Sequence, residues 1–322
     1  MERFIEVTDL SKSFTVRKKR EKGAFFREKT VVQALDRVSF SINAGELVGY
    51  IGPNGAGKST TVKLLSGILT PDGGEALVGG YVPWKERREY VRHIGVVFGQ
   101  RTQLWWDVPV LDSYRLLRDI YKVRPGEFDA RLDELTAALD LAPLLKTPLR
   151  QLSLGQRMRS EVAGSLLHSP RLLFLDEPTI GLDAVSKLKL RDFLLHENKA
   201  HGTTVLLTTH DMEDIRALCP RVMVLGHGHL LFDGALTRLL SRYDTVRCAR
   251  VRYQDLNAQP VLPQFCTIER EGEDYLVTCP HDRLDAGAFV GALQSAGHIE
   301  EMSLSSQNID RLIAGMYREM AL

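Results

Sequence analysis

The chain has 322 residues, of which 44% are hydrophobic and 26% are charged, and its formal net charge is +1 at pH 7. This composition is typical of a globular protein with a full core, and the length suits two domains. The near-neutral charge argues against a general nucleic-acid binder, which would usually be strongly basic, so no nucleic-acid partner is expected.

The sequence predicts a protein of the cytoplasm. The sequence has no uncharged apolar run of about 18 residues, so we expect no transmembrane helix. Its first six residues are too acidic for a signal peptide. The four cysteines form no C-x-x-C pair and are expected to be free thiols in a reducing compartment. Any work at a membrane would then be done from its cytoplasmic side, through partners.

The first part of the chain reads as strands around a basic insert. Residues 1–16 alternate as a strand, and strand-like sequence resumes at Val31 and at 38–42. Between them, residues 17–30 carry seven Lys or Arg against two Glu. This insert would either contact anionic headgroups or a partner, or be a solvated loop. A short apolar strand follows at 47–51.

The remaining pattern predicts alternating strands and helices, which implies a parallel, doubly wound sheet. A helical insert at about 103–168 interrupts it, because apolar residues there recur at i, i+3 and i+4. We expect a large domain at 1–238 and a small C-terminal α+β domain at 239–322. The expected elements are helices at 58 to about 69, 111–121, 127–141, 156–168, 285–296 and 308–319, a turn at 71–74, and strands at 94–98, 172–175, 205–208, 221–225, 228–232, 245–253, 265–270, 274–279 and 300–304.

A phosphate-binding loop follows the apolar strand 47–51 and precedes a helix. The residues fit G-x-x-x-x-G-K-[ST], in which glycines let backbone N–H groups converge on phosphate oxygens at a helix N-terminus. We expect Lys58 to neutralise the β- and γ-phosphates and Ser59 to bind Mg²⁺. The expected nucleotide contacts are Gly52, Pro53, Asn54, Gly55, Ala56, Gly57, Lys58, Ser59 and Thr60.

Two carboxylates end the buried strand at 172–176. Asp176 stands at the carboxyl end of that strand, where ligands bind in α/β sheets, and is expected either to bind Mg²⁺ directly or to hold one of its ligands. Glu177 adds a second carboxylate next to the expected γ-phosphate and is the expected general base. The alternative for either residue is a carboxylate solvated at a loop.

The order of the motifs resembles the ATP-binding cassette of ABC transporters. Besides the phosphate loop and the acidic strand, the chain has the signature-like segment Leu152-Ser153-Leu154-Gly155-Gln156. Gln100, Asp183 and His210 also stand in the family's order. The resemblance covers residues 1–235 and implies a P-loop NTPase (ABC ATPase) fold, with a mostly parallel sheet, an antiparallel β subdomain and a helical insert.

The same resemblance implies roles for these residues. Gln100 would touch Mg²⁺ and the attacking water, and His210 would hydrogen-bond the γ-phosphate, although it could instead be a core histidine. Ser153 and Gly155, with Gln156 beside them, would grip the γ-phosphate of ATP held by the other protomer. Asp183 would link the two sites across a dimer.

Two positions depart from the family's usual pattern. Leu154 stands where the family has glycine, so we expect a slightly altered geometry with function retained. Phe14 is the expected adenine-stacking residue, where the family more often has tyrosine, and such a contact is worth about 1–3 kcal/mol. Phe14 could instead be a core residue, with Phe25 or Phe26 stacking on adenine.

Taken together, the resemblance implies an ATPase subunit of an exporter: a head-to-tail homodimer that holds Mg²⁺ and ATP and drives separate membrane subunits from the cytoplasmic face of the membrane. Residues 99–114, the basic insert and the C-terminal domain resemble ABC-2 type exporters of the daunorubicin-resistance kind, whose permeases would be the partners. Trp105 and Trp106 are either anchors for such a partner or core aromatics.

Two other functions stay open, namely an ATP-gated factor without transport and an importer ATPase. The first usually has two cassettes in one chain, and this chain has one. A GTPase is rejected because Asn198-Lys199-Ala200-His201 lacks the acid of a guanine-binding motif.

Overall fold

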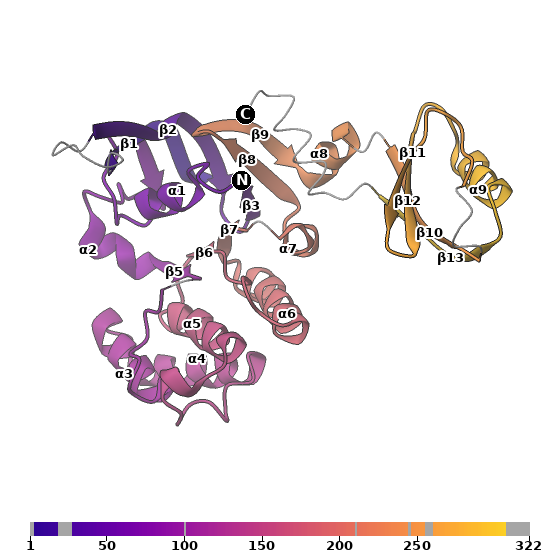
Figure 1. The fold of residues 1–322 in the computed structure, drawn as a ribbon. Helices are drawn as coiled ribbons and strands as arrows, with labels where there is room; N and C mark the ends of the chain where they lie inside the picture. The colour runs from indigo at the N-terminus through magenta and orange to yellow at the C-terminus, as the bar shows by residue number, and fades with distance from the viewer. Residues whose placement is uncertain are drawn as a thin grey trace, which may run out of the picture. The chain divides into compact units, whose positions relative to one another are not determined.

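A computed structural model of the chain describes residues 3–18, 28–99, 101–209, 211–243, 246–254 and 260–306. The chain divides into two compact units, Met1–Leu236 and Thr237–Leu322 (Figure 1). None of the helices within the described ranges combines the length and the apolar content that a bilayer span requires.

The first unit is built on a six-stranded sheet. Its first five strands run parallel, and the last is antiparallel to its neighbour, as expected for a doubly wound sheet with a closing hairpin. The strands in spatial order are β5 (Ile94–Phe98), β6 (Leu172–Asp176), β7 (Thr204–Thr208), β3 (Leu47–Ile51), β8 (Arg221–Gly226) and β9 (His229–Ala235).

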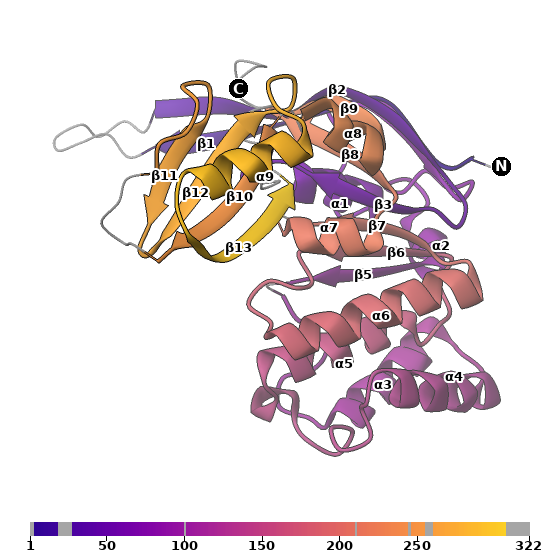
Figure 2. The same cartoon turned by 90° about the vertical axis from the view of Figure 1, so that its right-hand side faces the viewer.

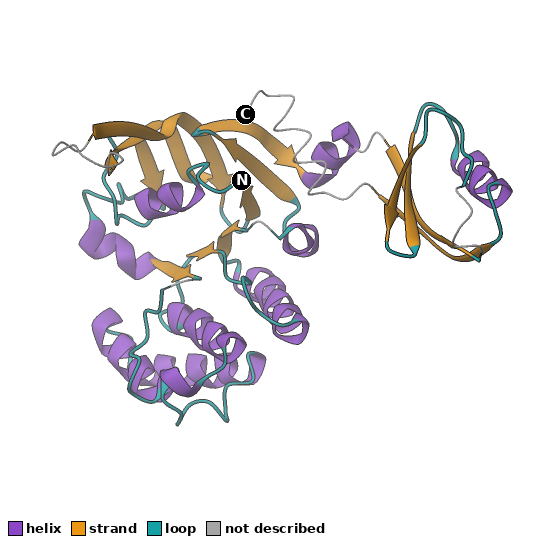
Figure 3. Cartoon of the chain, viewed as in Figure 1, coloured by secondary structure: helices purple, strands orange, loops and turns teal. Residues whose placement is uncertain are grey.

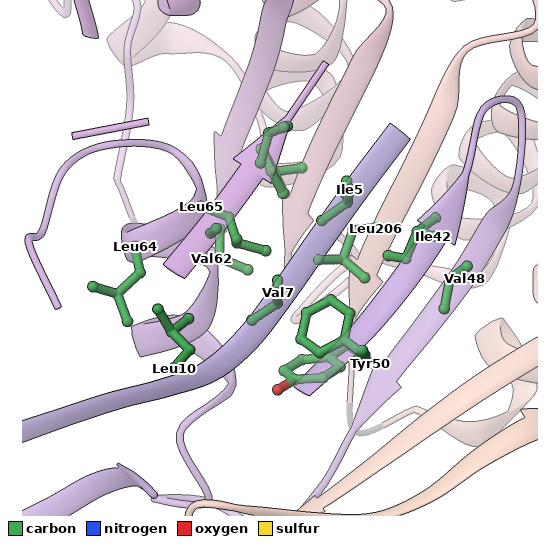
Figure 4. Packing of buried hydrophobic residues seen from close by; sticks show 14 of the residues in the cluster. Ile5, Val7, Leu10, Ile42, Val48, Tyr50, Val62, Leu64, Leu65 and Leu206 are labelled. Carbon is green, nitrogen blue, oxygen red and sulfur yellow. The ribbon is translucent and has the colours of Figure 1, made fainter. Parts of the chain in front are cut away.

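A separate antiparallel sheet packs over the first one. It consists of β2 (Glu28–Asn43), β1 (Arg3–Lys18) and β4 (Gly73–Val78), with β1 in the middle. The helix α1 (Lys58–Leu65) contributes to the core with both sheets. Figure 4 shows side chains of β1, α1 and β7 filling this core, among them Ile5, Val62 and Leu206.

The expected turn at 71–74 is followed directly by β4, a strand that the sequence pattern did not predict. Only Ala76 and Val78 of this strand are buried, so its sequence lacks an apolar run. Helix α1 ends at Leu65 rather than at about Leu69. The backbone turns left-handed at Gly67 (φ 72°), where a Cβ atom would lie 2.5 Å from the carbonyl oxygen of Pro83.

Helices form a subdomain beside the β5 side of the six-stranded sheet (Figures 1 and 3). Its three helices are α3 (Val110–Tyr121), α4 (Pro125–Ala138) and α5 (Leu154–Leu166), each close to the predicted range. The unit also contains the short α2 (Arg87–Tyr90), α6 (Ala184–His201) and α7 (Met212–Leu218). Helix α8 (Leu236–Tyr243) begins at the last residue of this unit and otherwise belongs to the second.

A buried ion pair joins this subdomain to the sheet layer. Arg131 of α4 donates to Glu197 of α6 across 2.6 Å, and only 7% and 2% of the two side chains are exposed. Arg131 also pairs with the half-exposed Glu134, and Glu197 accepts a further bond from Thr203. The helical subdomain is thereby tied to the helix that follows the acidic strand.

The second unit has its own core. Four antiparallel strands in the order β11 (Thr267–Glu271), β12 (Asp274–Pro280), β10 (Val246–Tyr253) and β13 (Ile299–Ser306) pack one face against helix α9 (Ala286–Ser295) (Figure 2). Phe289 and Leu293 of α9 meet Val251 and Val277 of the sheet. The helix predicted at 308–319 lies outside the described residues, as does most of the basic insert 17–30.

The Arg131–Glu197 pair predicts a large stability effect. Replacing Glu197 by alanine leaves the Arg131 guanidinium buried without its main counter-ion. Because Glu134 still pairs with it, we expect a loss of about 3 kcal/mol in the free energy of unfolding, at the low end for a broken buried pair. Urea unfolding measures this loss.

The matched control is Glu127→Ala, which breaks the fully exposed pair between Glu127 and Arg124 on the same helix. We expect the control to unfold at the wild-type urea concentration. Equal stability of the two variants would contradict the structural role of the buried pair.

Candidate functional site

Four loops meet at one edge of the six-stranded sheet, because β3, β5, β6 and β7 are parallel and their carboxyl ends lie together. The phosphate loop follows β3, Asp176 ends β6, and Glu177 comes directly after it. A cavity of about 580 Å³ opens at this edge. Its lining residues are Asn54, Ser59, Lys63, Phe98, Gly99, Arg101, Asp176, Glu177 and Ile180.

The phosphate loop is held in shape by its own lysine and glycines. Lys58 Nζ donates to the carbonyl oxygens of Gly52 (2.6 Å) and Pro53 (3.1 Å). Burial lowers the pKa of Lys58, while the nearby charges of Glu177 and Asp176 raise it. Gly57 has φ 110°, and a Cβ atom there would lie 2.4 Å from the carbonyl oxygen of Ala34, so only glycine fits.

The other residues of the loop differ in exposure. Asn54 and Gly55 are exposed with Pro53 at the loop's tip, while Ala56 is buried and Thr60 is half-buried in the first turn of α1. Gly52 passes so close to strand β8 that a Cβ atom would lie 2.3 Å from the carbonyl oxygen of Leu225.

One carboxylate joins three elements at the floor of the cavity. Asp176 accepts hydrogen bonds from Ser59 Oγ of α1 (3.1 Å) and from Thr208 Oγ1 at the end of β7 (2.5 Å). A hydroxyl and a carboxylate in contact at the cavity wall are the oxygen ligands that Mg²⁺ prefers, so the donor set fits that ion.

Glu177 has a strained backbone. Its φ is +55°, in the left-handed region that non-glycine residues rarely adopt. Its N–H donates to the carbonyl oxygen of Thr208 (2.9 Å), and Gly99 donates its N–H to the carbonyl oxygen of Asp176 (2.8 Å). These two hydrogen bonds hold the backbone at the end of β6, and the Glu177 side chain lines the cavity. Backbone strain of this kind clusters at functional sites.

A second cluster of expected site residues lies at the starts of α5 and α6, where Ser153 and Asp183 are exposed and Gly155 is buried. Ser153 is the N-cap of α5, forming a capping box in which Ser153 Oγ accepts from Gln156 N and the Gln156 side chain accepts from Ser153 N (2.9 Å). Asp183, the N-cap of α6, accepts a hydrogen bond from Ser186 Oγ (2.7 Å), and Gly155 lies against Ser186.

This cluster does not contribute to the cavity beside the phosphate loop. Within the described residues, Ser153, Gly155 and Asp183 are outside the lining of the cavity. Leu154, where the sequence departs from the family, packs at the surface against Gly181, where a Cβ atom would lie 2.9 Å from a Leu154 methyl group. The site residues thus form two groups, with phosphate-loop chemistry in one and the signature-like segment in the other.

Other expected site residues vary in how far they can be described. Phe14 is 37% exposed on β1, opposite Val32, so its ring is accessible and not a core side chain. Gln100, His210, Phe25 and Phe26 lie outside the described residues. Trp105 and Trp106 are 41% and 47% exposed, so the structure does not bury them in the helical core.

The sequence analysis missed two charged residues of the cavity lining, Lys63 and Arg101, and also Thr208, whose buried hydroxyl donates to Asp176. Arg101 directly follows Gln100, and Thr208 closes the strand before His210, so adjacency to a motif was the available signal. Lys63 lies one helical turn beyond Ser59, a spacing that puts both side chains on one face of α1.

Comparison with known proteins identifies the family. The family profile described as "ABC transporter" matches residues 35–180. The "ABC transporter ATP-binding protein NatA" of Bacillus subtilis is 31% identical over 249 residues, which cover 77% of this chain and 95% of that protein. The chain belongs to the ABC transporter ATP-binding family. It is therefore an ABC-type ATPase that binds ATP.

Two further relatives bear on the site of this ABC ATPase. The "Fluoroquinolones export ATP-binding protein Rv2688c" of Mycobacterium tuberculosis is 39% identical over 221 residues, or 68% of this chain and 71% of that protein. The "Dimeric structure of a post-hydrolysis state of the ATP-binding cassette MJ0796 bound to ADP and Pi" is 25% identical, with a TM-score of 0.62 over 72% of this chain and 98% of that one. The expected fold class is confirmed.

The close approach of Gly99 to Glu177 predicts a selective mutation. A Cβ atom at Gly99 would lie 2.4 Å from the carbonyl oxygen of Glu177, so Gly99→Ala must push the two strand ends apart. We expect a loss of about 1–3 kcal/mol in the free energy of unfolding, the usual cost of overpacking, and slower ATP hydrolysis. Urea unfolding and a steady-state ATPase assay measure both.

Gly126→Ala is the control, because a Cβ atom at Gly126 in α4 meets nothing within 4 Å. The control should keep wild-type stability or gain slightly, since alanine favours helix over glycine. If Gly99→Ala also behaved like wild type, Gly99 would not set the position of Glu177.

Proposed function

We propose that this chain is the ATP-hydrolysing subunit of an ABC exporter, working as a head-to-tail homodimer beneath separate membrane subunits. The observation that carries the proposal is the division of the site residues into two groups on one chain. To bind and hydrolyse ATP, the cavity with the phosphate loop and the carboxylates would need the signature-like segment of another copy. The signature-like segment of this chain would in turn need the phosphate loop of that copy. A second copy supplies both contacts at once through a two-fold axis.

The cavity residues divide the work of holding Mg²⁺ and ATP. Backbone N–H groups of the loop from Gly52 to Gly57 would hold the phosphates, and Lys58 would turn from its contacts with Gly52 and Pro53 to neutralise them. Ser59 and Asp176, already in contact, would hold the ion with Gln100. Mg²⁺ supplies charge neutralisation on the phosphate oxygens when bound. The accessible ring of Phe14 would stack on adenine.

Glu177 would act as the general base toward the water that attacks the γ-phosphate. The left-handed backbone of Glu177 and the hydrogen bond from its N–H to Thr208 fix the direction in which the side chain leaves the backbone. A base contributes only when it is positioned within hydrogen-bond reach of its proton, so this rigidity favours the role. His210 would orient the same water next to the phosphate.

The partner copy would bring Ser153, Gly155 and Gln156 to the γ-phosphate. The capping box of Ser153 and Gln156 satisfies the first turn of α5, and the exposure of Ser153 leaves the positive end of that helix accessible. Asp183 bonds to Ser186, which lies against Gly155. Asp183 would therefore link the two sites of the dimer. The dimeric form of the MJ0796 cassette supports this assembly.

The membrane partner would dock on the helical side. The exposed Trp105 and Trp106 rings follow directly on the loop that lines the cavity, and large exposed aromatics are favoured anchors in interfaces. The resemblance at residues 99–114 and the export function named for the Mycobacterium relative favour ABC-2 type permeases. The subunit would then be peripheral, at the cytoplasmic face of the membrane.

The role of Glu177 predicts a slow but assembly-competent variant. Glu177→Gln removes the base without changing its shape, so ATP hydrolysis should fall at least about 10²-fold, while ATP-driven dimerisation persists. Steady-state phosphate release and size-exclusion chromatography with ATP measure the two effects. Glu75→Gln, at an exposed carboxylate of β4, serves as the control. Wild-type turnover in Glu177→Gln would remove the base assignment.

The tryptophan surface predicts a docking defect. The double change Trp105→Ala with Trp106→Ala should weaken co-purification with the membrane subunits, because hot-spot aromatics contribute about 2 kcal/mol or more each. Leu195→Ala, at a similarly exposed apolar residue of α6, is the control. ATP hydrolysis by the isolated subunit should be retained in both. Undiminished co-purification of the double variant would rule out this docking surface.

A further inference from the structure

A buried carboxylate lies outside the cavity in the helical subdomain. Glu161 of α5 is only 4% exposed. It accepts hydrogen bonds from Thr102 Oγ1 and from the backbone N–H of Gln103 (3.1 Å). In return, the Gln103 side chain donates to the Glu161 carbonyl oxygen (3.0 Å). Burial raises the pKa of Glu161, and the hydrogen bonds from this loop oppose the rise.

The loop held by Glu161 reaches from the cavity to the surface. Arg101 lines the phosphate cavity at one end, and Trp105 and Trp106 are exposed at the other. The tryptophan end is also fastened, because Trp105 N–H donates to the buried Ser113 Oγ of α3 (3.1 Å). The Trp106 ring lies 5.6 Å from the Arg157 guanidinium of α5. Four residues of the segment Arg101–Trp106 therefore contact α3 or α5, namely Thr102, Gln103, Trp105 and Trp106.

The helix that carries Glu161 begins at the signature-like segment. Ser153 caps α5, and Glu161 follows eight residues later, about 12 Å along a continuous helix. A helix this short transmits a displacement of one end to the other without bending. A displacement of the loop would thus displace Ser153, and a displacement of Ser153 would displace the loop.

A buried carboxylate is a poor choice for stability alone. Removing a carboxylate from water is costly, and an apolar side chain of similar volume often packs as well or better. The cost of removing the carboxylate from water is offset only where hydrogen-bond donors meet it. Here those donors come from one loop. The arrangement therefore fixes a geometry between the loop and α5.

We propose that Glu161 is a positioning residue that makes the segment Arg101–Trp106 and helix α5 move as one body, so that occupancy of the phosphate cavity shifts the tryptophans and Ser153 together. This inference rests on the proposed nucleotide cycle but not on the direction of transport. The ligand that would drive the movement is the same nucleotide, and the movement would change the position of the two exposed tryptophan rings.

Tryptophan fluorescence tests the inference on the full-length chain. The chain has three tryptophans, so Trp84→Phe leaves Trp105 and Trp106 as the only reporters. Emission and iodide quenching are recorded while ATP is added in the presence of EDTA, and binding is followed separately with a fluorescent ATP analogue. In this background the tryptophan signal should change as the binding site fills.

Two variants at Glu161 separate geometry from folding. Glu161→Ala removes both acceptors, and we expect most of the tryptophan response to be lost. Glu161→Gln keeps one acceptor oxygen at the same place and should restore part of the response. Analogue binding should stay at the level of the Trp84→Phe parent in both.

Tyr114→Phe is the matched control. It removes the buried hydrogen bond from the Tyr114 hydroxyl to the Ser160 carbonyl oxygen (2.9 Å), next to Glu161 on α5, without touching the loop. A full response in Tyr114→Phe, with a lost response in Glu161→Ala, supports the clamp. An equal loss of the response in both variants would mean that Glu161 acts only through packing, which would overturn the proposed clamp.

Two other outcomes also overturn the clamp. Full responses in both Glu161 variants would show that the loop moves without it, and a parent that binds the analogue without any tryptophan change would show that the loop does not move. Failure of the parent to bind ATP at all would instead contradict the proposed function.

Discussion

The carboxylate of Asp176 is the contact on which the rest of the site depends. It receives hydrogen bonds from Ser59 at the start of α1 and from Thr208 at the end of β7, and it stands at the end of β6. Three elements that are far apart in the sequence are thereby fixed around one oxygen-rich point. The parallel order of the sheet makes this possible, because only parallel neighbours bring their carboxyl ends together.

The helical subdomain shows a different logic, in which charges are buried to fix orientation. Arg131 and Glu197 fasten α4 to α6, and Glu161 fastens the loop beside the cavity to α5. Since α6 starts at Asp183 and α5 starts at Ser153, both fastenings act on helices whose first residues are exposed and expected to meet the second copy. The chain thus has a cavity at the sheet edge and, outside the lining of that cavity, two helices that begin at exposed N-cap residues.

The sequence predicted the parts of this site that are local. The phosphate loop and the pair Asp176-Glu177 each follow a short apolar strand, so their placement at the sheet edge could be inferred from pattern alone. Strand β4 could not, because its exposed face and the glycines at 73–74 read as a turn. The contacts of Glu161 with Thr102 and of Arg131 with Glu197 span 59 and 66 residues, and no local pattern reports such pairs. The left-handed backbone of Glu177 was likewise invisible, because it is set by the neighbouring strand ends.

The most direct test of the account is complementation between two inactive variants. Lys58→Ala disables the phosphate loop of its own chain, and Ser153→Arg blocks the signature-like segment that is offered to a partner. In a mixed dimer, one site combines both defects and the other combines two intact halves. The account predicts that each variant alone is nearly inactive and that mixing them restores ATP hydrolysis. Mixtures no more active than the separate variants, while mixed dimers are detected with ATP, would contradict a site shared between two copies.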